Sequence, residues 1–251
     1  MKNNQLLKGV RILDLSRILA GPWATQLLAD YGAEVIKVER PNTGDDTRKW
    51  GPPWNFDKDN KRSDAAYFYA ANRNKQSLTC DISKPEGQVI IKQLVSSSDV
   101  LVENFKFGTL NKYGLNIEEL RKINSDIIYC SISAYSNKSS RKMEPGYDAM
   151  IQASAGLMSI TGAKNGNPQK VGVAVSDIMA GMYAATAILA SLFQRLEKGV
   201  TQDINVPLYD SQVAWLANQN MNYLIGGKTP ERMGNAHPNI SPYQSYNTKD
   251  G

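Results

Sequence analysis

The chain has 251 residues, 41% of them hydrophobic, and a formal net charge of +5. This length allows one large domain, or one domain and a piece of another. A mildly positive balance could suit nucleic acid, a membrane surface or a phosphate-bearing small ligand. The absence of a run of Lys and Arg argues against nucleic acid.

Three further features bear on compartment and membranes. The two cysteines, Cys80 and Cys130, match no metal or redox spacing and predict buried thiols in a reducing compartment. The N-terminus has neither the apolar core of a signal peptide nor an arginine-rich transit character, so we expect a cytoplasmic protein. Val171–Phe193 is long enough to span a membrane, but Asp177 within it would be costly there. A buried strand–helix pair explains this segment better, so no membrane role is expected.

The chain begins with a predicted strand–helix–strand unit, the start of an open parallel sheet. Its parts are a strand at residues 10–15, a helix at 23–31 that follows Pro22 and ends at Gly32, and a strand at 35–39. The unit lacks G-x-G-x-x-G, which argues against a nicotinamide or flavin dinucleotide. Residues 40–64 predict a long irregular loop of the functional kind. Trp50 and Trp54 within it are either plugs over the core or a lid over a ligand.

Strands and helices continue to alternate up to residue 133. We expect a helix at 65–72, a strand at 77–81, a helix from the capping box Ser83-x-x-Glu86 to about 96, a strand at 100–103, a helix at 116–123 and a strand at 127–133. This rhythm predicts an α/β fold, a Rossmann-like, open and mostly parallel sheet with helices on both faces.

Polar residues stand where four of the predicted strands end. They are the groups Asp14–Arg17, Arg40, Glu103–Phe105 and Ser133–Tyr135. Because ligands of such sheets bind beyond the carboxyl ends of the strands, these groups predict one site at that edge.

Asp177 is the lone charged residue of Val171–Phe193. After a helix at 147–156 and a turn region at 162–170, Val171–Val175 predicts a short buried strand and Ile178–Leu192 a helix. Asp177 lies between them, where a helix N-cap belongs. Its carboxylate either caps the helix or acts as a nucleophile. The helix N-terminus favours the ionised form of this carboxylate, whereas burial favours the neutral form.

The sequence contains few of the residues that other catalytic mechanisms require. A single histidine, His237, removes most Ser-His-Asp and Cys-His schemes unless it serves in one. No His/Cys cluster predicts a metal site, and no G-x-x-x-x-G-K-[ST] predicts a nucleoside triphosphatase. Carboxylate chemistry remains.

The last part of the chain predicts a strand at 203–206, a helix at 208–226 and irregular structure at 226–251. We expect a large Rossmann-like domain at 1–225 and the start of a linker at 226–251. The chain stops at Gly251 in what reads as a turn toward a further strand, so a fragment is expected.

Six blocks of the sequence, in this order, resemble the class III CoA-transferases, the formyl-CoA transferase family. They are LDLSRILAGPWATQLLADYGAEVIKVERPNTGDDTRKWGPP (13–53), NRNKQSLTCDI (72–82), DVLVENFKFGTLNKYGL (99–115), PGYDAMIQASAGLMSITG (145–162), GVAVSDIMAGMYAATAILASL (172–192) and GNAHPNISPYQSYNTKDG (234–251). The match runs from Leu6 to Gly251. The blocks GDDTRKWGPPW and GNAHPNISPYQ look most like the dicarboxylate branch, that of succinate–hydroxymethylglutarate CoA-transferase.

The resemblance implies transfer of coenzyme A between carboxylic acids, such as succinate and glutarate. Asp177 would attack the acyl-CoA thioester to form an aspartyl anhydride, and then an aspartyl-CoA thioester. Acyl-CoA and the carboxylate acceptor would be substrates, with no permanently bound cofactor and no metal. Two alternatives stay open: a CoA-binding remnant without turnover, and an α-methylacyl-CoA racemase. The racemase is weaker because Tyr147 stands where racemases have a histidine.

The resemblance also assigns residues. The positions that match CoA contacts are Ile18, Arg40, Cys80, Ser83, Asn104, Phe105, Lys112 and Tyr135. The positions expected to line the substrate pocket are Trp50, Tyr67, Tyr147 and His237. A basic Arg40 would suit a CoA phosphate, and Lys112 replaces an arginine. The His237-Pro238-Asn239-Ile240 segment replaces a four-glycine loop, which argues against oxalate and formyl-CoA. Full family members form interlocked homodimers with a small second domain, most of which this chain is expected to lack.

Overall fold

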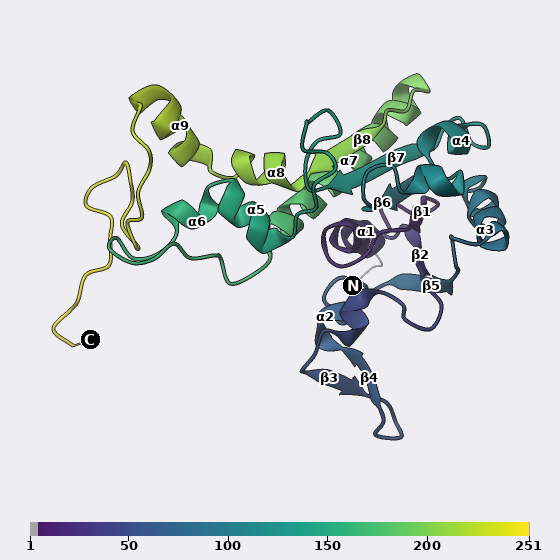
Figure 1. Ribbon diagram of the computed structural model, residues 1–251, viewed down its shortest axis with the longest axis horizontal. Helices are drawn as coiled ribbons and strands as arrows, with labels where there is room; N and C mark the ends of the chain where they lie inside the picture. Colours follow the sequence, from purple (N-terminus) through teal and green to yellow (C-terminus); the bar gives the residue numbers. More distant parts are fainter. Residues whose placement is uncertain (1–4, 251) are drawn as a thin grey trace.

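The computed structural model describes residues 5–250 and is built around a six-stranded parallel sheet (Figure 1). Residues 1–4 and Gly251 lie outside that description. Across the sheet the strands are β5 (Lys75–Thr79), β2 (Glu34–Glu39), β1 (Arg11–Asp14), β6 (Val100–Glu103), β7 (Ile128–Ser133) and β8 (Ile204–Pro207). The predicted parallel sheet is confirmed.

Helices cover both faces of the sheet, as predicted. The helices α1 (Ala20–Asp30) and α7 (Val175–Lys198) pack on one face, and α3 (Pro85–Val95) and α4 (Ile117–Arg121) contribute to the core on the other. The alternation of buried strand residues explains the two layers: Val100 and Val102 join the α1/α7 core, and Leu101 joins the α3/α4 core. Strands buried on both faces read as continuous apolar runs.

The segment before α7 differs from the prediction. No strand forms over Val171–Val175, and α7 begins at Val175. The backbone of this segment bonds elsewhere: Val171 N donates to Gln152 Oε1 at 2.8 Å, and Val175 N to Val173 O at 2.9 Å. The N-cap is Ala174, so of the two roles left open for Asp177 the N-cap is ruled out, and Asp177 lies in the first turn.

Helix α7 passes the length and composition test for a membrane span. Just over half of its most apolar window is buried inside the protein, where α7 packs against α1. A central core helix passes the same test as a span.

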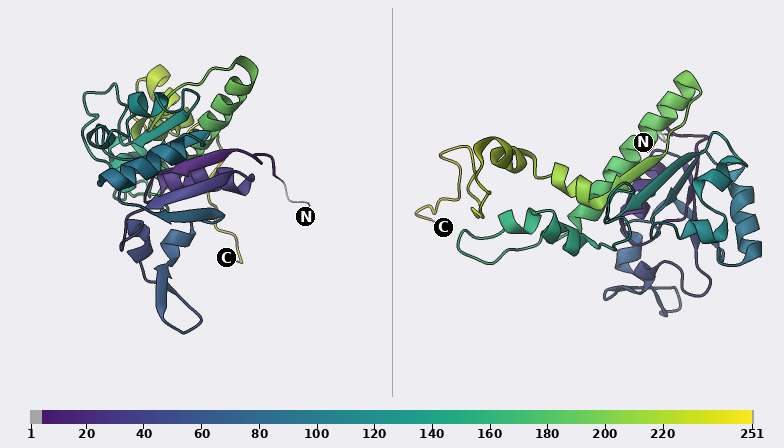
Figure 2. Two further views of the ribbon diagram at one scale, coloured as in Figure 1. Left: turned by 90° about the vertical axis from the view of Figure 1, so that its right-hand side faces the viewer. Right: turned by 45° about the horizontal axis from the view of Figure 1, so that its top comes forward.

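The region predicted as an irregular loop holds regular structure. A short 3₁₀ helix η1 (Asp46–Lys49) is followed by an antiparallel hairpin of β3 (Trp54–Phe56) and β4 (Arg62–Ala65), and then by α2 (Ala66–Tyr69). Figure 2 shows this hairpin projecting from the body of the sheet. The loop prediction for residues 40–64 depended on their polar composition. Polar residues are found both in loops and in hairpins of exposed strands, so they do not distinguish the two.

Two helix predictions also need correction. The predicted helix 208–226 is interrupted after α8 (Leu208–Ala214) and resumes as α9 (Ala217–Gly226), with Ala217 at φ 47°. The capping box at Ser83 does not form, because the Ser83 hydroxyl donates to Asp81 Oδ1 at 2.6 Å and α3 begins after Lys84. In contrast, Asn116 opens α4 as predicted and accepts from Glu119 N.

The elements beyond the sheet extend to one side. They are α5 (Asp148–Ser154), α6 (Leu157–Ile160), α9 and the C-terminal segment, which Figure 1 shows reaching away from the strands. The chain forms a further 3₁₀ turn, η2 (Leu110–Tyr113), before α4. The division into 1–225 and 226–251 stays a prediction.

Candidate active site

A crevice lies where the order of the strands reverses. From β1 the chain proceeds to β2 and β5 on one side, whereas β6, β7 and β8 lie on the other. The loops after β1 and β6 therefore meet at the carboxyl edge, the place where open α/β sheets bind ligands. The Asn104 side chain joins them: its Oδ1 accepts from Arg17 N at 2.8 Å, and its Nδ2 donates to Arg17 O at 2.7 Å.

The first cavity at this crevice, of about 290 Å³, contains Asp177. It brings together five residues that the sequence assigned to a site from distant positions: Ile18, Asn104, Phe105, Tyr147 and Asp177. They come from the β1 and β6 loops, the start of α5 and the first turn of α7. Main-chain and apolar side-chain atoms of residues 18–20 form one wall.

The environment of Asp177 favours its neutral form. Burial, and then the nearby Asp148 carboxylate, raise the pKa of Asp177 from 3.8 to about 7. Asp148 is held in place: its Oδ1 accepts from Ser176 N at 2.8 Å and its Oδ2 from Gln152 Nε2 at 2.7 Å. Burial and Asp148 together outweigh the effect of the helix N-terminus, which was expected to favour the ionised form. Asp177 is therefore mostly protonated below neutral pH, and its carboxylate is more basic than usual.

The second cavity, of about 250 Å³, lies on the β2 side of the crevice. It contains four of the expected CoA contacts, Arg40, Cys80, Ser83 and Phe105. Phe105 and Arg17 line both cavities. Arg17 and Arg40 both bind Asp46, at 3.2 Å and 2.6 Å. Two guanidinium groups in the lining of a mainly apolar cavity suit a ligand that carries phosphate.

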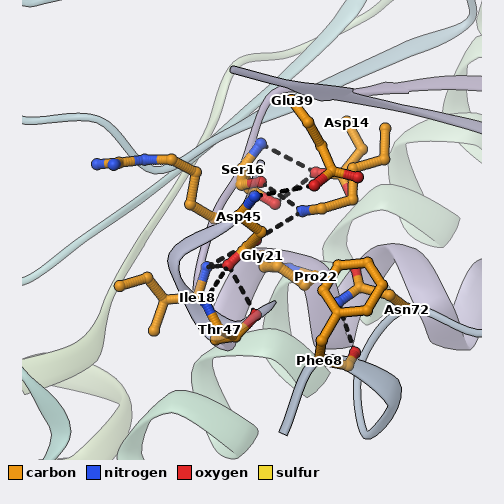
Figure 3. A network of polar contacts seen from close by, with 12 residues as sticks. Asp14, Ser16, Ile18, Gly21, Pro22, Glu39, Asp45, Thr47, Phe68 and Asn72 are labelled. Atoms are coloured by element: carbon orange, nitrogen blue, oxygen red, sulfur yellow. Dashed lines mark hydrogen bonds and ion pairs between the residues drawn. The ribbon is translucent and has the colours of Figure 1, made fainter. Parts of the chain in front are cut away.

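A network of buried polar and charged groups includes Asp14, Ser16, Glu39 and Asp45 (Figure 3). Asp14, at the end of β1, accepts from Thr25 Oγ1 at 2.6 Å and from Lys75 Nζ at 3.1 Å. Burial acts to raise the pKa of Asp14, but Lys75, Lys37 and its hydrogen bonds together lower it to about 2. Asp14 therefore lies under the site as a paired carboxylate and lines none of the cavities described here.

Glu103, the last residue of β6, is buried at the carboxyl edge of the sheet. Its Oε2 accepts from Phe105 N at 2.8 Å, and burial raises its pKa to about 7. It lines a third cavity, of about 500 Å³, together with Tyr135 and Phe105. Tyr135 itself is buried, with its ring 5.6 Å from that of Tyr209.

Trp50 and Tyr67 lie together. Their rings meet edge to face with centroids 5.2 Å apart. Burial, and then the charges of Asp177 and Asp148, raise the pKa of Tyr67, but neither ring lines any of the cavities described here. Trp50 is 43% exposed, so it does not plug the core.

Two further expected site residues also lie outside these cavities. Lys112 is exposed on η2 and lines none of the three cavities. His237 lies on the C-terminal segment, where its ring meets Tyr243 and its Nδ1 accepts from the amides of Asn239 and Ile240. Among residues 5–250, no three His, Cys, Asp or Glu side chains gather as metal ligands would.

Asp148 is a residue of this site that the sequence did not single out. One local signal was present: Asp148 and Gln152 stand four apart at the start of a helix, where they meet on one face. The contact of Asp148 with Ser176 of α7 joins residues that are 28 positions apart, so no local sequence pattern could predict it.

Comparisons with known proteins identify the family of this chain. The family model for CoA-transferase family III matches residues 7–251. The chain is 51% identical over 245 residues to a succinate–glutarate CoA-transferase of Agrobacterium fabrum, covering 98% of this chain and 61% of that protein. It is 48% identical over 251 residues to a human succinyl-CoA:glutarate CoA-transferase, covering 100% and 56%. A crystal structure of a CAIB/BAIF family protein from Brucella suis superposes with a TM-score of 0.92 at 50% identity, covering 99% and 65%.

Proposed function

Because this chain belongs to CoA-transferase family III, we propose that it transfers coenzyme A between dicarboxylic acids such as succinate and glutarate, with Asp177 as the nucleophile. The observation that carries the proposal is the Asp177 cavity at the reversal of the strand order, lined by the β1 and β6 loops. The names of two similar proteins support the choice of acids. The chain spans 56–61% of the lengths of these relatives.

The first half of the reaction removes the acyl group from CoA. A carboxylate oxygen of Asp177 attacks the thioester carbonyl carbon, the C–S bond breaks, and CoA leaves as a thiolate. The product is a mixed anhydride between Asp177 and the acyl group. The thiolate then attacks the aspartyl carbonyl of this anhydride, which releases the donor as a free carboxylate and leaves an aspartyl-CoA thioester.

The second half repeats the steps in reverse with the acceptor. The acceptor carboxylate attacks the aspartyl thioester, CoA thiolate leaves again, and a new anhydride forms. Attack of the thiolate on the acceptor's carbonyl yields the new acyl-CoA and frees the Asp177 carboxylate. No proton is gained or lost overall, so the scheme needs no histidine base and no resident cofactor.

The two cavities suit the two ends of a CoA thioester. The Asp177 cavity takes the thioester, and the cavity with Arg40 takes the phosphates, whose charge would replace that of Asp46 at the guanidinium groups. Arg17 and Phe105, which line both cavities, lie along the route of the pantetheine arm.

Trapping of the aspartyl intermediate tests the proposal. The 251-residue chain is incubated with succinyl-CoA and then hydroxylamine, and peptides are examined by mass spectrometry. We expect a hydroxamate on Asp177, and we expect Asp177→Asn to lower the exchange of CoA onto glutarate by about 10³-fold or more. Asp210→Asn is the matched control, since Asp210 lies in the first turn of α8. Full exchange by Asp177→Asn would contradict the mechanism, and CoA binding without exchange would indicate a binding remnant.

A further inference from the structure

The loop between β1 and α1 contains a strained residue. Ile18 adopts φ 71°, in the left-handed region that a β-branched side chain rarely occupies. Such a conformation is unfavourable for a β-branched residue and persists only where surrounding groups impose it. Ile18 lines the Asp177 cavity, so its conformation determines the shape of that wall.

The Asp45 carboxylate holds the backbone of Ile18. Ile18 N donates to Asp45 Oδ1 at 3.3 Å and to Oδ2 at 3.2 Å (Figure 3). Thr47 fixes the carboxylate from the other side, donating from N at 3.0 Å and from Oγ1 at 2.8 Å to Oδ1. Asp45 is 1% exposed, so water does not compete for these bonds.

Lys37 completes the clamp. Its Nζ lies 2.9 Å from Asp45 Oδ2 and donates to Ser16 O at 2.9 Å, which fixes the loop two residues earlier. Both side chains of the pair are almost fully buried, at 2% and 0% exposure. A buried pair is held by its mutual attraction, and loss of one partner leaves an uncompensated charge.

We propose that Asp45, paired with Lys37, is a positioning residue that imposes the left-handed conformation of Ile18 and thereby shapes the wall of the Asp177 cavity. Asp45 and Lys37 line the neighbouring cavity, so the clamp lies between the two ends of the proposed CoA route. The consequence for CoA rests on the proposed function. The clamp itself is a property of the fold.

The substitution Ile18→Gly distinguishes a positioning role of Asp45 from a general contribution of Asp45 to stability. Glycine reaches φ above zero without steric cost, so it needs no clamp. If Asp45 acts by imposing this conformation, Ile18→Gly will restore function lost in Asp45→Ala. If Asp45 only supports the fold, the glycine will restore nothing.

The test measures two quantities on the full 251-residue chain: amide hydrogen exchange and the Kd for CoA by calorimetry. In Asp45→Ala we expect the Ile18 amide to exchange at least tenfold faster while amides of β1 are unchanged, and the Kd to rise at least tenfold. Adding Ile18→Gly is expected to return the Kd to within about threefold of the Ile18→Gly single variant. Asp99→Ala is the control, because Asp99 also accepts a backbone amide and pairs with an arginine, but before β6 at the opposite edge.

Each outcome decides the proposal. Unchanged Ile18 exchange in Asp45→Ala, or a Kd that the glycine does not restore, would overturn it. If Asp45→Ala does not fold, Asp45→Asn keeps one acceptor oxygen for Ile18 N but removes the charge, and must still accelerate exchange at Ile18 selectively. If the unaltered chain binds no CoA, the proposed function fails, while the exchange data alone still confirm or overturn the clamp.

Discussion

At the scale of single residues, the chemistry of this protein depends on one carboxylate whose proton affinity is tuned by its neighbours. Burial, together with the nearby Asp148 carboxylate, raises the pKa of Asp177 to about 7. A more basic carboxylate is a stronger nucleophile, but it is ionised only at and above neutral pH. The same environment therefore sets both the nucleophilicity of Asp177 and the pH range in which it can react.

The pH dependence of the first chemical step should report this pKa. Because only ionised Asp177 attacks, we expect the rate of adduct formation to fall as the pH drops through about 7. Asp148→Asn removes the second cause of the shift, so the acid limb should move to lower pH. Single-turnover rates between pH 5 and 9 measure it. An unshifted limb in Asp148→Asn would show that Asp148 does not act on Asp177 by charge.

The same shift predicts a cost in stability. A carboxyl whose folded pKa is above its unfolded value stabilises the fold below pH 4, and this contribution is lost as the pH rises from about 4 to 7. Asp177→Asn removes the cost, so it should raise the free energy of unfolding by about 1–3 kcal/mol at pH 8 and by less at pH 4. Urea unfolding at both pH values measures the difference. Equal effects at pH 4 and pH 8 would contradict the assignment.

At the scale of elements, the site depends on how closely α1 approaches α7. Gly181 on α7 lies against the start of α1: a Cβ there would lie 2.6 Å from Ala20 O and 3.1 Å from the Trp23 Cβ. The first residue of α1, Ala20, and Asp177 in the first turn of α7 line the same cavity. The spacing of the two helices therefore sets the width of the site.

Gly181→Ala should push these helices apart. We expect the free energy of unfolding to fall by about 1–3 kcal/mol, because backbone at 2.6 Å must move, and the Kd for CoA to rise. Gly226→Ala is the matched control, a helical glycine whose added Cβ meets nothing within 4 Å. Urea unfolding and calorimetry give both values. A neutral Gly181→Ala would mean that the two helices relax without affecting the cavity.

At the scale of the whole molecule, one face of α7 is left apolar and exposed. Met182, Leu189, Phe193 and Leu196 follow heptad-like spacing and are 46%, 36%, 66% and 83% exposed. Apolar residues at this spacing form one stripe along a helix. The homodimer expected from the family resemblance stays a prediction, and this stripe is where association of the chain is expected.

Charges on the stripe should weaken that association. We expect the 251-residue chain to self-associate with rising concentration, and Phe193→Lys with Leu196→Lys to shift it toward monomer, because burying two ammonium groups is costly. Sedimentation velocity measures the distribution. Glu197→Lys, an exposed neighbour outside the stripe, controls for net charge. A chain that stays monomeric at every concentration would contradict the prediction.

Local sequence pattern determined the sheet, most of its helices and the candidate nucleophile. The strands around Val100 and Ile128 could be predicted because continuous apolar runs between turn residues specify strands buried on both faces. Asp177 stood out because a lone charge in an apolar run is costly unless it serves a purpose. The residues that gather at the crevice could be listed because they follow strand ends.

Only the tertiary structure decided where backbone groups and charges find distant partners. The segment before α7 is β-branched like a strand, but its amides bond to Gln152 and to itself, so no strand forms. The clamp joins Asp45 to Ile18 across 27 residues, and the contact of Asp148 with Ser176 spans 28. Hydropathy and spacing report which surfaces a segment can bury. They do not report which remote carboxylate will satisfy a given amide, and that choice gives this site its shape and its pKa.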